Sequence, residues 1–103
     1  MKDDNMKLKE AIAHCVDIFK RTFESKEDYY NHVRLMTYLT ALDRIRNGHD
    51  RTVSLSEVNE QDLRDDITTL ERSLAYECFS CEACRSDHLD LLRWMKELLT
   101  IME

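Results

Sequence analysis

The sequence has no proline and a single glycine, Gly48, among its 103 residues. Tight turns between strands and phosphate-binding loops depend on these two residue types. A chain almost without them makes few such turns, so the composition predicts an all-α protein. The lone glycine also argues against a glycine-rich loop that binds a nucleotide.

Long apolar runs are missing as well. The uninterrupted apolar stretches are only a few residues long, whereas a helix that crosses a bilayer needs about 20 apolar residues. The chain opens on a polar segment, residues 1–5. We therefore expect no secretory signal peptide and a cytoplasmic, intracellular location.

Basic residues are fewer than acidic ones. The 15 Lys and Arg residues face 21 Asp and Glu residues, which gives a formal net charge of −6. Contacts to phosphate groups need a basic surface, so the charge argues against nucleic-acid binding, and we expect no membrane partner. Either ordinary solubility or a partner with a basic surface explains the acidity.

Hydrophobic residues make up 43% of the chain and charged residues 35%, which is typical of a globular protein. The length predicts one domain over residues 1–103. The apolar spacing predicts a helix from about Asp3 to Glu24, and a second from just after Ser25 to about Asn47, where Gly48 supplies a left-handed turn. The expected buried residues of these two helices are Leu8, Ile12, Cys15, Val16, Phe19 and Phe23, then Leu35, Tyr38, Leu39, Leu42 and Ile45.

The segment 49–56 is expected to be a loop, with a short extended stretch over residues 51–55. Ser54 to Glu57 have the pattern of a capping box, so a third helix is predicted to start there.

The third helix carries a row of residues whose spacing alternates between four and three positions, the repeat of a coiled coil. The row is Leu63, Ile67, Leu70, Leu74, Glu77, Cys81, Cys84, His88, Leu91, Met95, Leu98 and Met102. An unbroken helix from about Ser56 to Met102 would be about 70 Å long and would need cover from a second chain. A break at residues 85–88, with Ser86 or Asp87 as a new cap, would instead let the helix fold back.

The register runs through residues 85–88 without a slip, which favours the unbroken helix. The fold expected on this basis is an all-α, three- or four-helix bundle with a long C-terminal helix in a helical homodimer. The interface would be formed by the apolar members of the row, Leu63, Ile67, Leu70, Leu74, Leu91, Met95, Leu98 and Met102.

The middle of the row is polar and includes sulfur. Together with Cys78, the middle of the row contains four residues of the types that ligate zinc: Cys78, Cys81, Cys84 and His88. On a straight helix, however, Cys78 and Cys84 are about 9 Å apart along the axis, which is too far for two thiolates on one ion. A zinc site would therefore need local unwinding near Cys84, ligands from a second chain, or ligands from the first helix, where His14 and Cys15 lie.

Two other interpretations of the cysteines remain open. They are small side chains that pack as hydrophobic residues in a core. Alternatively, their two CxxC spacings serve redox chemistry, although a position inside a helix beside Glu77 and Glu82 should raise the thiol pKa values.

A second apolar face would contain Tyr76, Phe79, Ala83 and Trp94. It is expected to be covered by the first two helices, the alternative being an exposed docking patch.

The His49–Asp50 pair lacks convincing His and Asp partners for hydrolytic metal chemistry, and no catalytic triad is evident. The sequence therefore predicts a non-enzymatic interaction protein, an adaptor or inhibitor that acts through protein contacts and has no cofactor. The alternative is a helical module stabilised by zinc.

Overall fold

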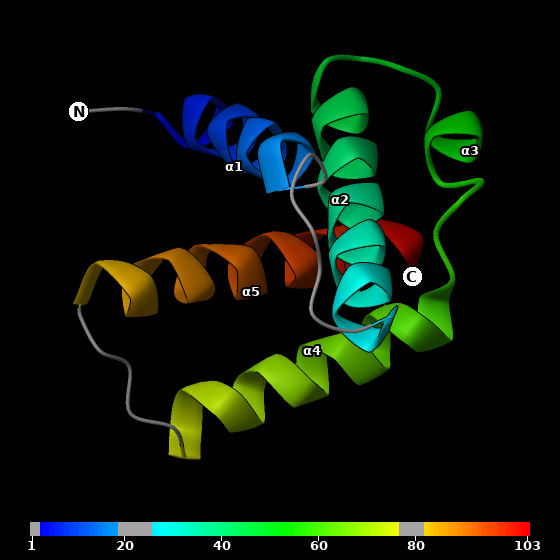
Figure 1. The fold of residues 1–103 in the computed structure, drawn as a ribbon. Helices are drawn as coiled ribbons and strands as arrows, with labels where there is room; N and C mark the ends of the chain where they lie inside the picture. The colour runs from blue at the N-terminus through cyan, green and yellow to red at the C-terminus, as the bar shows by residue number, and fades with distance from the viewer. Residues whose placement is uncertain (1–2, 19–25, 77–81) are drawn as a thin grey trace. The chain divides into compact units, whose positions relative to one another are not determined.

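The structure is a computed structural model that describes residues 3–18, 26–76 and 82–103 (Figure 1). The described residues form α1 (Asp4–Ile18), α2 (Lys26–Arg46), α3 (Arg51–Ser54), α4 (Glu60–Tyr76) and α5 (Glu82–Met102). No strand occurs among them. The prediction of an all-α protein is confirmed.

The chain divides into two compact units, Met1–Val58 (unit 1) and Asn59–Glu103 (unit 2). Each unit contains a pair of packed helices, α1 with α2 in unit 1 and α4 with α5 in unit 2, and α3 also packs against α2. The single domain over residues 1–103 stays a prediction. Over the ranges that the structure describes, none of the helices has the length and apolar character needed to span a membrane.

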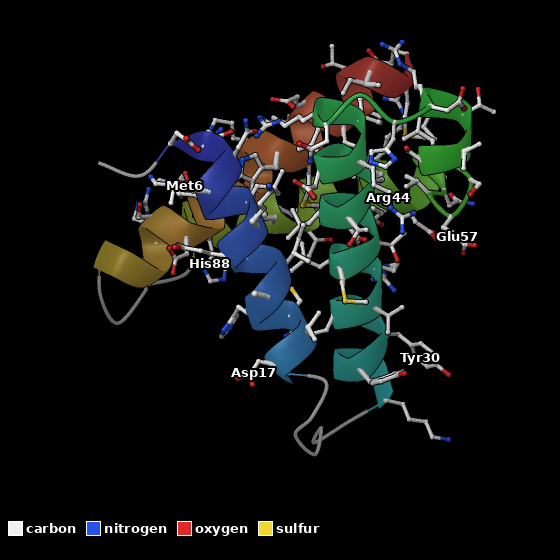
Figure 2. All side chains as sticks on the ribbon, turned by 90° about the horizontal axis from the view of Figure 1, so that it is seen from above. Met6, Asp17, Tyr30, Arg44, Glu57 and His88 are labelled. Carbon is white, nitrogen blue, oxygen red and sulfur yellow. The ribbon has the colours of Figure 1, made fainter. Side chains whose placement is uncertain are left out.

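In unit 1 the start of α1 is capped by a side chain and contacts the end of α2. The Asp3 carboxylate accepts a hydrogen bond of 2.8 Å from the backbone N–H of Met6, which satisfies one of the amides left free at a helix start. Arg46, the last residue of α2, lies 2.7 Å from the Asp4 carboxylate and 3.0 Å from the Asn5 side-chain oxygen. Since the last turn of α2 meets the first turn of α1, the two helices run antiparallel (Figure 2, blue and teal).

Five of the side chains predicted to be buried in unit 1 are buried, namely Leu8, Cys15, Tyr38, Leu39 and Leu42, whereas Ile12, Leu35 and Ile45 are half-buried. The side chains of this unit below one tenth exposure are Leu8, Cys15, Tyr38, Leu39, Ala41, Leu42 and Ser54. Val16 is an error in the prediction, because it is 46% exposed. Each step of four residues drifts by about 40° around a helix, so the progression from Leu8 through Ile12 leaves Val16 off the buried face. Phe19 and Phe23 lie outside the described residues.

The end of α2 follows the predicted pattern. Gly48 has a φ of 86°, the left-handed conformation that other residues avoid. The N–H of Gly48 donates to the carbonyl of Ile45 at 3.1 Å, and the N–H of His49 donates to the carbonyl of Arg44 at 3.0 Å. Together these bonds form a Schellman motif, which satisfies carbonyls that the helix leaves free.

The segment after Gly48 differs from the prediction of an extended stretch. It forms α3, a single helical turn, because the Asp50 carboxylate caps the N–H of Val53 at 2.9 Å. Ser54 is the last residue of α3 and is buried, so it does not open the next helix.

The start of the third long helix is therefore four residues later than predicted. α4 begins at Glu60, and its cap is Asn59, whose side-chain oxygen accepts from the N–H of Asp62 at 2.9 Å. The carbonyl of Asn59 accepts the next bond, from Leu63, at 3.0 Å. Asn is as good a cap as Ser, and here it prevails over the Ser54–Glu57 pattern.

Unit 2 is an antiparallel helical hairpin (Figure 1). Arg64, near the start of α4, lies 2.9 Å from the carboxylate of Glu103, just beyond α5. Near the opposite end, Arg85 donates to the carbonyl of Leu74 at 3.3 Å. The first turns of α4 thus lie beside the last turn of α5, and the last turns of α4 beside the first turn of α5.

The predicted unbroken helix from about Ser56 to Met102 is wrong. α4 ends at Tyr76 and α5 begins at Glu82, while residues 85–88, the predicted alternative break, are helical within α5. The apolar row marks the buried face of each helix, but its spacing does not specify which chain supplies the cover. Here α4 and α5 pack against each other, so the row does not require a second chain.

Candidate functional site

The predicted interface row is largely buried within the single chain. Five of its apolar members, Leu63, Ile67, Leu74, Met95 and Leu98, are below one tenth exposure. Leu70, Leu91 and Met102 are half-buried. The role of the row in a contact between two copies stays a prediction, and the long helix that led to it is absent.

The polar centre of the row is only partly visible. Glu77, Cys78 and Cys81 lie outside the described residues, and so does the side chain of Cys84, whose backbone belongs to the first turn of α5. His88 is half-buried on α5, one turn after Cys84 (Figure 2). Among the described side chains, no three His, Cys, Asp or Glu residues lie where they would hold one metal ion. The zinc and redox roles of the cysteines stay predictions.

The two further zinc ligands suggested on the first helix differ in their environment. The thiol of Cys15 is 4% exposed, and its burial raises its pKa, because removal from water disfavours the thiolate. His14 is exposed. Cys15 therefore lies on the buried face of α1, whereas His14 lies on its exposed face.

The predicted second apolar face is represented by Trp94. Its indole is 3% exposed, and the guanidinium carbon of Arg93 lies 5.5 Å from the ring centroid, within the range of a cation–π contact. The alternative of an exposed docking patch at Trp94 is wrong. The side chains of Tyr76, Phe79 and Ala83 lie outside the described residues.

The residues of the His49–Asp50 pair serve different purposes. Asp50 caps α3, and His49 is exposed. A carboxylate that accepts a backbone hydrogen bond at a helix start has an ordinary structural role.

Exposed aromatic residues are a feature that the apolar spacing does not reveal. Tyr29 and Tyr30 lie near the start of α2, with ring centroids 5.6 Å apart in an edge-to-face arrangement. Tyr30 is 57% exposed, and Figure 2 shows it at the end of unit 1 where Asp17 also lies. The signal in the sequence is the pair of adjacent tyrosines, which lie outside the apolar row predicted for this helix.

The two units differ in charge. Residues 1–58 hold ten basic and ten acidic side chains, whereas residues 59–103 hold five basic and eleven acidic ones. The whole formal net charge of −6 therefore belongs to unit 2. The sequence contains all of these charged residues, but only the structural boundary between Val58 and Asn59 shows that the excess of acidic residues lies in one unit.

Most basic residues of unit 2 form ion pairs with carboxylates of the same helical hairpin. Three of them form ion pairs with carboxylates of the same unit: Arg64 with Glu60 and Glu103, Arg93 with Asp90, and Lys96 with Glu71. Other carboxylates are exposed, among them Asp62 and Asp65 on α4 and Asp87 on α5. We call these three residues the acidic set.

Comparison with models of known protein families, with curated proteins and with solved structures finds no match to this chain.

Proposed function

We propose that this chain is a non-enzymatic interaction protein that binds a protein partner with a basic surface, through the acidic set of unit 2, as an adaptor or inhibitor. The observation that carries this proposal is the unequal charge of the two units. Unit 1 is neutral by formal charge, so the acidity is not a uniform device for solubility.

Helix electrostatics explain only part of the acidity of unit 2. A carboxylate in the first turn of a helix is stabilised by the positive end of the macrodipole, and the effect fades beyond that turn. Glu60 and Asp62 lie in the first turn of α4. Asp65 and Asp87 lie beyond the first turns of α4 and α5, so neither helix start accounts for them.

The same charge selects among partners. Nucleic acid and anionic membrane surfaces carry negative charge and are repelled, whereas a basic protein surface is attracted over about 8–10 Å at physiological ionic strength. Two copies of unit 2 that meet face to face would repel each other. The predicted bundle and homodimer remain part of the proposal, with a dimer contact away from the acidic set.

The test is a pull-down from the native host with two variants of equal net charge. The first carries Asp62→Asn, Asp65→Asn and Asp87→Asn in unit 2. The control carries Glu10→Gln, Asp17→Asn and Glu57→Gln, which are exposed positions of unit 1. We expect basic proteins to be captured by the wild type and the control, and lost by the unit 2 variant.

The proposal is overturned if both variants capture the same partners as the wild type, or if the captured proteins are acidic. Far-ultraviolet circular dichroism of both variants verifies that their helices are intact. Capture should also weaken as salt is raised from about 0.1 M to about 0.5 M, because screening shortens the reach of exposed charges.

A zinc-stabilised module is the second candidate, and the break between α4 and α5 favours it. Cys78, Cys81, Cys84 and His88 would be too far apart to share one ion only if all four lay on a single straight helix. In the structure α5 begins at Glu82, so it contains Cys84 and His88 but neither of the other two. Cys84 and His88 are one turn apart on α5, a spacing that suits two ligands of one ion.

A further inference from the structure

No further inference is drawn: the strongest candidate, the exposed aromatic patch that Tyr29 and Tyr30 form at the start of α2 in unit 1, carries nothing because no observation in the described part of the chain shows what covers it.

Discussion

The ammonium nitrogen of Lys96 lies 3.4 Å from the carboxylate of Glu71. These residues are 25 positions apart in the sequence, and one straight helix would hold them about 38 Å apart. Their proximity therefore distinguishes the hairpin of unit 2 from a single long helix.

A carbodiimide, which joins an amine to a carboxylate without a spacer, should link Lys96 to Glu71. The expected product is a cross-linked peptide in the monomer band, identified by mass spectrometry. Glu71→Gln should abolish this link because the carboxylate is gone. Equal mixtures of ¹⁴N- and ¹⁵N-labelled chains separate links within one chain from links between chains. A link found only between chains would contradict the hairpin.

Two leucines of α5 offer a matched test of the core of unit 2. Leu98 is fully buried, whereas Leu89 is 45% exposed. Leu98→Ala should lower the free energy of unfolding by about 2–5 kcal/mol, because the change removes buried apolar surface and leaves a cavity. Leu89→Ala should cost less than about 1 kcal/mol. Urea denaturation followed by circular dichroism measures both, and equal losses would contradict the assigned face of α5.

Gly48 offers a test of backbone conformation without a change in packing. A Cβ added there would meet no atom within 4 Å, so the cost of a side chain lies in the φ of 86°. Gly48→Ala should therefore destabilise unit 1 by about 1–2 kcal/mol. Gly48→Asn should cost less, because asparagine tolerates the left-handed conformation better. Thermal denaturation of the two variants gives the order, and the reverse order would refute this account of the end of α2.

The buried thiol of Cys15 predicts a pH dependence of stability. Burial raises its pKa, so the native chain keeps the proton to higher pH than the unfolded chain does. The contribution is fully present below the ordinary thiol pKa of about 8.5, and the free energy of unfolding falls as the pH rises above that value.

The measurement compares the loss of stability between pH 7 and about pH 10 in the presence and absence of Cys15. Both proteins carry Cys78→Ser, Cys81→Ser and Cys84→Ser, so that the other thiols do not contribute. Cys15→Ala should lose less stability over this range. An identical pH dependence for the two proteins would mean that the thiol is not protected from water.

Zinc content separates the two candidate functions. If Cys78, Cys81, Cys84 and His88 bind a structural ion, the protein purified without chelator contains about one equivalent of zinc, and a chelator lowers its melting temperature. His88→Ala should weaken retention of the ion. Less than about a quarter of an equivalent by elemental analysis, with no effect of chelator, removes the zinc alternative. Native mass spectrometry reports bound zinc and the number of chains together.

Helix faces and one helix end were predictable from local chemistry. Leu39 and Leu42 follow the apolar period of α2, and Gly48, the one glycine of the sequence, adopts the left-handed conformation at the end of that helix. Such features depend on neighbours within a few positions, which the sequence displays directly.

The positions of the other helix ends were not predictable in the same way. Ser54 and Asn59 are both good caps, and only the packing of unit 1, which buries Ser54 at the end of α3, decides between them. The sequence between Tyr76 and Glu82 contains no glycine or proline. The four-three row also runs through it without a slip, so its register fits a long rod and a hairpin equally well.

The pairing of neighbouring helices has a kinetic consequence. In each unit the packed long helices are successive along the chain, α1 with α2 and α4 with α5, so the residues that meet are separated by short stretches of sequence. Loop closure then costs little entropy, and helical proteins with such local topology fold in microseconds to milliseconds. A newly made chain would consequently expose its apolar side chains only briefly.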